Sequence, residues 1–226
     1  MSAWFVTGTD TGVGKTLVAQ ALLHRLAADH ARVVGMKPVA AGAERSADGR
    51  WTNEDVLALQ DASTVELPRE WTNPVLLRDP VSPHIAAQRE GRVIEIASIL
   101  HALTRLRNAA DAVVVEGAGG FRVPLGDAQD GADLAVALGL PLILVVGLRL
   151  GCLNHALLSA ESIAARGLRL AGWVANHIDP DMAEPDANIA LLRRRLPAPC
   201  LGELPFQQPP DARASAARLR LPDPTP

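Results

Sequence analysis

Residues 3–16 read AWFVTGTDTGVGKT and constrain the fold more than any other stretch of the chain. Ala3 to Val6 is a short apolar run that predicts a buried strand. Three glycines follow, then a Lys-Thr pair, then apolar residues spaced as in a helix. This order predicts a phosphate-binding loop, in which backbone N–H groups and the helix N-terminus surround a polyphosphate. The strict pattern has glycine where this chain has Thr9, so a glycine-rich strand–helix turn is the alternative interpretation.

The rest of the chain alternates predicted strands and helices. We expect strands at 3–6, 32–36, 112–115, 142–146, 170–175 and 200–204, and helices after residue 16 and at 54–60, 82–90, 94–106, 130–138, 154–166 and 187–196. The strands are continuous apolar runs, as in parallel sheets that are buried on both faces. We therefore predict an α/β fold, a single P-loop NTPase domain over 1–226 with a mostly parallel sheet flanked by helices on both faces. Residues 40–51 and 68–83 are predicted to be irregular, and the Pro-rich tail from about 205 to 226 is predicted to lack regular structure.

Composition narrows the classes of function. The 226 residues are 48% hydrophobic and carry a net charge of −3 without a long basic run, which argues against a nucleic-acid partner. Two distant cysteines suit a reducing compartment, and no signal peptide is recognisable, so we expect a cytoplasmic protein. The uncharged stretch 134–148 is too short for a membrane span, and Gly139 and Pro141 interrupt it, so no membrane association is expected.

Lysine is rare in this sequence. Lys15 and Lys37 are the only lysines among 22 basic residues, and Lys15 lies in the predicted phosphate loop. An ammonium is compact and an arginine fork is wide, so the two are not interchangeable at a crowded phosphate. We predict that Lys37 is functional as well; the alternative is a surface residue kept by chance.

Several polar signals fall where predicted strands end. They are the phosphate loop, Lys37, Glu116 and Asn176, and open parallel sheets bind ligands along that edge. Thr16 offers a hydroxyl to Mg²⁺, while Glu116 and Asp55 are the candidate carboxylates. The alternatives are a strand-end acid in solvent for Glu116 and an ordinary first-turn acid for Asp55. Residues 117–120, Gly-Ala-Gly-Gly, would let a substrate approach the backbone, or form a plain turn.

These residues belong to a longer pattern that resembles the dethiobiotin synthetase family along nearly the whole chain. The matching blocks are GTDTGVGKT (8–16), KPVAAG (37–42), NEDVLAL (53–59), NPVLL (73–77), SPHIAAQREG (82–91), VVEGAGG (114–120), LPLILVVGLRLGCLNHALL (140–158), LAGWVANH (170–177) and LGELPF (201–206). The resemblance implies an ATP- and Mg²⁺-dependent ligase of biotin synthesis acting on 7,8-diaminononanoate and CO₂. One amine becomes a carbamate, ATP phosphorylates it, and the other amine closes the ureido ring.

The resemblance also implies roles for residues. Lys15 and Lys37 would be catalytic, and Thr16, Asp55 and Glu116 would hold Mg²⁺. The implied ATP-binding set is Gly12, Val13, Gly14, Lys15, Thr16, Asp55, Glu116, Gly117, Ala118, Gly119, Asn176, His177, Pro205, Phe206 and Gln207. The implied substrate-binding set is Thr11, Lys37, Ala41, Gly119 and Asn154.

Three positions depart from the family pattern. The family often has Ser where this chain has Ala41, and some members have Glu where this chain has Gly12. Asp is more usual than His at the position of His177. One substrate hydrogen bond is therefore missing or supplied by backbone, and the contacts to the base are less defined.

The resemblance implies a homodimer in which Asn154 reaches the neighbour's substrate carboxylate. The segment 150–155 opens a helix whose Leu157, Leu158 and Ile163 are expected to offer apolar surface. If Asn154 instead caps its own helix, no shared site follows.

Two other classes remain open at this point. A nucleotide-switch ATPase of the partitioning or cell-division type would share the fold, but it carries a lysine where this chain has Asp10. A related amidating synthase would normally continue into a glutaminase domain, for which there is no room.

Overall fold

The computed structural model describes residues 2–222, and its centre is a six-stranded sheet in the order β10-β9-β8-β1-β7-β2. Every neighbouring pair in this sheet is parallel. The strands are β1 (Ser2–Gly8), β2 (Val33–Met36), β7 (Ala112–Glu116), β8 (Leu142–Leu148), β9 (Leu170–His177) and β10 (Cys200–Leu204). The predicted parallel α/β fold is confirmed.

Both faces of the sheet are covered by helices. Trp4 and Val6 pack into the cluster formed with α1 (Lys15–Leu26), α2 (Glu54–Ala62) and α9 (Ala212–Ala216), while Phe5 packs into the cluster on the other face. The second face is covered by α5 (Ile96–Ala109), α6 (Gly131–Leu138), α7 (Cys152–Ala165) and α8 (Pro185–Arg195). Successive side chains of a strand point to opposite faces, so burial on both faces requires the continuous apolar runs seen in the sequence.

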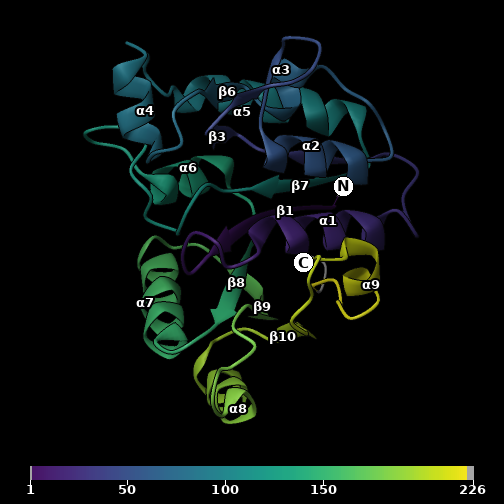
Figure 1. Cartoon of the computed structure of the whole chain (residues 1–226), viewed down its shortest axis with the longest axis vertical. Helices are drawn as coiled ribbons and strands as arrows, with labels where there is room; N and C mark the ends of the chain where they lie inside the picture. The colour runs from purple at the N-terminus through teal and green to yellow at the C-terminus, as the bar shows by residue number, and fades with distance from the viewer. Residues whose placement is uncertain (1, 223–226) are drawn as a thin grey trace.

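A second group of elements lies next to the edge strand β2. β3 (Val39–Ala41) pairs in parallel with β6 (Val75–Leu77), and β4 (Glu44–Arg45) pairs with β5 (Trp51–Thr52) in a short hairpin. α3 (Arg69–Thr72) and α4 (Pro83–Arg89) complete the group. Figure 1 shows α2–α5 and the β3–β6 pair together at one end of the molecule, with α7 and α8 toward the other end.

The prediction that 40–51 and 68–83 are irregular was therefore wrong in part. Three-residue strands carry no detectable period, and β3 and β6 are paired across more than thirty residues of chain, so no local pattern marks them.

The predicted helix at 154–166 begins earlier, at Cys152, after Gly151 in the left-handed conformation (φ 94°). Asn154 lies inside the first turn and is exposed, so it does not cap the helix. Ile163, predicted to offer apolar surface, is 1% exposed and belongs to the core, because its face of α7 packs on the sheet. Leu158 is exposed, as predicted, whereas Leu157 is partly buried against the core. Leu150, just before the helix, is also exposed.

The prediction that the tail from 205 lacks regular structure was also wrong in part. α9 packs against α1, and Ser215, Ala216 and Leu219 are buried there. Asp211 starts this helix by accepting a hydrogen bond from the Ala214 N–H. The end of the tail, 223–226, lies outside the described residues. None of the helices described in 2–222 has the length and apolar character needed to cross a bilayer.

Candidate nucleotide and metal site

The predicted phosphate loop connects β1 to α1 at the carboxyl edge of the sheet. α1 begins at Lys15, and Gly14 before it has φ 87°, a left-handed conformation that favours glycine. A Cβ on Gly14 would lie 2.1 Å from Nδ2 of Asn176, so a side chain at position 14 would collide with that residue. Asn176, at the end of β9, donates from the same Nδ2 to the Val13 carbonyl (2.9 Å). The loop is thus held closely against the end of β9, which β8 separates from β1 in the sheet.

Lys37 and two carboxylates form the centre of the site. The Lys37 ammonium lies 2.6 Å from Asp55 Oδ2 and 2.7 Å from Glu116 Oε1. The Thr16 hydroxyl lies within hydrogen-bond distance of both acids, at 2.7 Å from Asp55 Oδ1 and 2.9 Å from Glu116 Oε1. Lys37 directly follows β2, while Asp55, Glu116 and Thr16 lie in α2, β7 and α1, and 100 positions separate Thr16 from Glu116. The fold brings together the three residues that we predicted for the metal and Lys37, one of the two predicted for catalysis. The ammonium of the other, Lys15, donates to the Asp10 carbonyl (2.9 Å).

Each of these elements places its residue for a local reason. β1, β2 and β7 are parallel neighbours, so Lys37 and Glu116 leave the sheet at the same edge as the loop. Asp55 is in the first turn of α2, which Asn53 caps by accepting a hydrogen bond from the Asp55 N–H (3.1 Å). Asn53 also donates to the Ala41 carbonyl (3.2 Å), which ties the predicted substrate residue Ala41 to this helix start.

Burial and charge shift the pKa values in the cluster. Burial disfavours the Lys37 ammonium, but Glu116 and Asp55 outweigh that effect and raise the pKa of Lys37. Burial raises the pKa of Glu116, and Lys37 and Thr16 oppose this only in part. The Asp55 carboxyl has a lowered pKa because Lys37 overcomes the cost of its burial. Burial, helped by the Lys37 charge, lowers the pKa of Lys15 to about 8.

The donor set fits a hard divalent cation. Glu116 is fully buried, and its Oε2 has no hydrogen-bond partner among the described residues. A buried carboxylate oxygen without a donor is costly unless a cation or ligand satisfies it. Two carboxylates and a hydroxyl are the oxygen ligands that Mg²⁺ takes from a protein when phosphates and waters complete its shell. Within 2–222 no cluster of three or more His, Cys, Asp or Glu side chains offers another metal site.

The residues predicted for the base lie along the β9 and β10 ends. Leu204 pairs with Asn176, so 205–207 follow directly beside His177. Phe206 is 43% exposed, while Gln207 accepts a hydrogen bond from the Asp211 N–H (2.9 Å) and thereby connects to α9. These residues form one strand-end group next to the loop.

The residues predicted for the substrate are less closely grouped. A Cβ on Gly119 would lie 3.6 Å from the Thr11 hydroxyl, which places these two residues side by side. Gly119 has φ 54°, so residues 117–120 form a turn that packs against the backbone of 8–10. Asn154 stands apart: among the described residues no hydrogen bond connects it to the cluster.

Asn73 contributes to the site and was not predicted from the sequence. Its buried side chain donates to the Lys37 carbonyl (2.7 Å) and to the Val75 carbonyl (3.2 Å), which holds the backbone at Lys37. An Asn-Pro pair that interrupts an irregular stretch was the signal available. The ion pair formed by Asp10 and Arg149 was also not predicted from the sequence.

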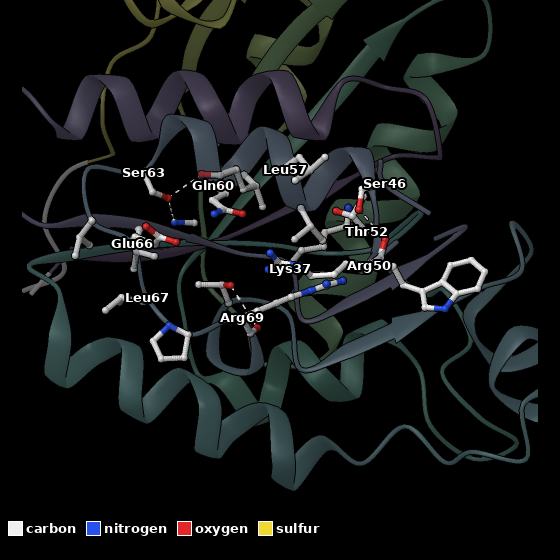
Figure 2. A pocket seen from close by; sticks show the side chains of 18 of the residues that line it. Lys37, Ser46, Arg50, Thr52, Leu57, Gln60, Ser63, Glu66, Leu67 and Arg69 are labelled. Atoms are coloured by element: carbon white, nitrogen blue, oxygen red, sulfur yellow. Dashed lines mark hydrogen bonds between the residues drawn. The ribbon is translucent and has the colours of Figure 1, made fainter. Parts of the chain in front are cut away.

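A cavity of about 750 Å³ lies outside the edge strand β2, a volume within the usual range of ligand pockets. Figure 2 shows Lys37 among its lining residues, with Leu57 and Gln60 of α2 on one side and Arg69 on the other. Lys37 is the only predicted site residue that lines it. The cavity therefore borders Lys37, but no residue of the phosphate loop lines it.

Fold and site define a P-loop nucleotide-binding protein. A family model described as an AAA domain matches residues 2–213. The septum site-determining protein MinD complexed with Mg-ADP from Pyrococcus horikoshii OT3 superposes with a TM-score of 0.57 at 18% identity, covering 95% of this chain and 92% of that one. A ParA family ATPase from Chlorobium tepidum TLS gives 0.57 at 12% identity, covering 95% and 90%. At these identities the likeness shows the fold alone.

The curated relatives are more specific. The ATP-dependent dethiobiotin synthetase BioD of Aromatoleum aromaticum is 57% identical over 220 residues, 97% of each chain. The BioD of Ralstonia nicotianae is 58% identical over 217 residues, 96% of this chain and 94% of that one. The chain belongs to the ATP-dependent dethiobiotin synthetase family. The family expected from the sequence blocks is confirmed, and the partitioning-type ATPase, which shares only the fold, is not favoured.

Proposed function

We propose that this protein is an ATP-dependent dethiobiotin synthetase that closes the ureido ring of dethiobiotin from 7,8-diaminononanoate, CO₂ and ATP. The observation that supports this most directly is the position of Lys37. Its ammonium forms ion pairs with Asp55 and Glu116 at the edge of the sheet where the phosphate loop also lies. The chain thus has a second fixed cation beside the place where a terminal phosphate would lie.

The reaction explains why two cations are needed. One substrate amine adds to CO₂ and loses a proton, giving a carbamate. A carbamate oxygen attacks the γ-phosphorus of ATP, the bond to the β–γ bridging oxygen breaks, and ADP leaves. The other amine then attacks the carbonyl of the mixed anhydride and expels phosphate, which closes the cyclic urea. Two anions must meet in the first transfer, so fixed positive charge lowers the barrier.

Each lysine has its own role in this scheme. Lys15, at the start of α1, stabilises the charge on the phosphates together with the backbone N–H groups of 12–14. Lys37 holds the carbamate and offsets the charge that develops on the transferring phosphoryl group. Both ammonium groups are buried, which strengthens their interaction with an anion relative to water.

Mg²⁺ is part of the proposal, and Thr16, Asp55 and Glu116 would hold it. The unsatisfied Oε2 of Glu116 supports this assignment. When bound, the ion neutralises phosphate charge. The Lys37 ammonium forms ion pairs with the same two carboxylates. When Mg²⁺ binds to them, it would replace Lys37 there, and Lys37 would be free to turn toward the substrate.

The nucleotide would extend from the loop along the ends of β9 and β10. Asn176, His177 and 205–207 would contact the base, and 116–119 would lie along the phosphates and the substrate. Because Asn176 already donates to Val13, its remaining amide N–H and its oxygen are the groups available to the base.

We also propose a cytoplasmic homodimer with shared sites. Leu150, just before α7, is 96% exposed, and Leu158, in the middle of α7, is 56% exposed. Asn154 lies in the first turn between them, and in the described residues no hydrogen bond connects it to the cluster of its own chain. Asn154 of one protomer would then contact the substrate carboxylate bound to the other, helped by the α7 N-terminus. Both cysteines are free and buried, which suits a reducing compartment.

A turnover assay tests the activity itself. Purified protein with 7,8-diaminononanoate, bicarbonate and MgATP should form dethiobiotin, ADP and phosphate in equal amounts. ATP hydrolysis that is independent of the diamine, with no dethiobiotin formed, would contradict the proposal and favour a nucleotide-switch ATPase.

Mixing two inactive variants tests the shared site. Lys37→Gln and Asn154→Ala would each be nearly inactive, and they would be unfolded and refolded together. If sites are shared, mixed dimers have one intact site each, and random pairing restores about a quarter of the original activity. If mass measurement confirms mixed dimers and no activity returns, the shared site is wrong.

A further inference from the structure

An ion pair connects the phosphate loop to the residue that follows β8. Arg149 Nη2 lies 2.5 Å from Asp10 Oδ2, although 139 positions separate the two residues. Arg149 directly follows β8, and Asp10 follows β1 by two residues. β1 and β8 are parallel neighbours, with Gly8 opposite Val145, so both strands end at the same edge. The pair therefore lies within the candidate nucleotide site.

Asp10 uses each of its oxygens for a different contact. Oδ1 accepts a hydrogen bond from the Thr11 N–H (2.7 Å), and Oδ2 takes the Arg149 guanidinium. The main-chain carbonyl accepts a hydrogen bond from the Lys15 ammonium (2.9 Å). Asp10 thus stands between a guanidinium and the ammonium that would bind the phosphates.

The negative charge of Asp10 opposes the binding of an anion to this loop. Asp10 would repel an incoming polyphosphate unless its charge is compensated. Lys15 contacts only the carbonyl of Asp10, so the Arg149 guanidinium is the compensating charge within hydrogen-bond distance of the carboxylate in the described residues. A guanidinium engaged through one nitrogen also keeps further N–H donors available.

We propose that Arg149 is a positioning residue for the nucleotide: by holding and neutralising Asp10, it keeps the phosphate loop receptive to polyphosphate and fixes the resting place of Lys15. The side chains of Arg149 and Asp10 are 43% and 44% exposed, and pairs this exposed contribute little to folding stability. The consequence of losing Arg149 is therefore expected in nucleotide binding and not in the melting temperature. This inference rests on the proposed nucleotide site.

The test compares four variants by calorimetric titration with MgADP and by KM for ATP. Arg149→Met should weaken MgADP binding by about tenfold, the effect of one uncompensated charge at a partly exposed site. Arg149→Lys should recover part of the loss. Asp10→Asn keeps the oxygen that accepts from Thr11 but removes the negative charge, so the double variant Asp10→Asn/Arg149→Met should bind better than Arg149→Met alone.

Arg193→Met is the matched control. It breaks the ion pair of Arg193 with Glu203, whose side chains are 48% and 40% exposed and lie on α8 and β10. This variant should leave MgADP binding unchanged and shift the melting temperature as little as Arg149→Met does. Unchanged MgADP affinity in Arg149→Met, or a double variant as weak as Arg149→Met, would overturn the proposal. Because MgADP binding is measured without the diamine, a failure to form dethiobiotin is a separate result.

Discussion

The depressed pKa of Lys15 predicts that nucleotide binding depends on pH. Burial, with help from the Lys37 charge, lowers this pKa from 10.5 to about 8, a shift that corresponds to about 3 kcal/mol. At pH 7 the ammonium is almost fully charged, and at pH 9 only about a tenth of it remains. A bound polyphosphate favours the charged form and raises the pKa again, so ATP binding at pH 9 must be accompanied by proton uptake.

The expected change in MgATP affinity follows from the protonation of Lys15 alone. Between pH 7 and pH 9 the apparent Kd for MgATP should rise about tenfold, and calorimetry in buffers of different ionisation enthalpy should detect close to one proton taken up at pH 9. In Lys15→Met, MgATP should bind more weakly at both values, and its affinity should lose this pH dependence.

Because the chain has only two lysines, the pKa of Lys15 can be measured directly by NMR. With ¹³Cε-labelled lysine, the chain should give two side-chain signals, from Lys15 and Lys37. One should titrate near pH 8, and the other should remain charged throughout, because Glu116 and Asp55 raise the pKa of Lys37 above its ordinary value. If both signals stay unchanged up to pH 10, the reasoning from burial is refuted.

The same shift affects stability in a defined window. Between about pH 8 and pH 10.5 the unfolded chain keeps the Lys15 proton and the folded chain has lost it, so this residue makes stability rise with pH. Below about pH 8 both states are charged, and the full cost of burying the ammonium is present. Lys37 acts in the opposite sense: its stabilising contribution is complete below pH 10.5 and is lost as the pH rises through its raised folded-state pKa.

Three further predictions concern single residues. Lys37→Gln should lower kcat by about two orders of magnitude or more with little change in MgATP binding, since its charge acts on the developing phosphoryl charge; near-normal turnover would contradict this. Asp55→Ala should need about tenfold more Mg²⁺ for half-maximal rate, and an unchanged Mg²⁺ titration would make Asp55 an ordinary helix-start acid. Gly14→Ala should cost about 1–3 kcal/mol more in urea unfolding than Gly49→Ala, because both have positive φ but only at Gly14 does a Cβ meet Asn176; equal costs would exclude that contact as the cause.

Local sequence determined much of the fold. The run before Gly8, the glycines and the Lys-Thr pair predicted strand, loop and helix, because strand burial and helix starts depend on neighbours in the chain. The same holds for the predicted helices at 54–60 and 130–138, whose starts depend on local capping. Asn53 accepts a hydrogen bond from the Asp55 N–H, and Asp130 accepts from the N–H groups of Ala132 and Asp133. Since parallel strands end at one edge, even the meeting of Lys37 with Glu116 was predictable.

Tertiary structure decided what depends on distant partners. The pairing of β3 with β6, the packing of α9 on α1 and the burial of Ile163 follow from surfaces that meet only after the chain has folded. The charge state of the site also depends on which side chains the fold brings next to each lysine. Lys15 and Lys37 are the same residue type, yet one pKa falls and the other rises, because only Lys37 lies against two carboxylates that compensate its burial.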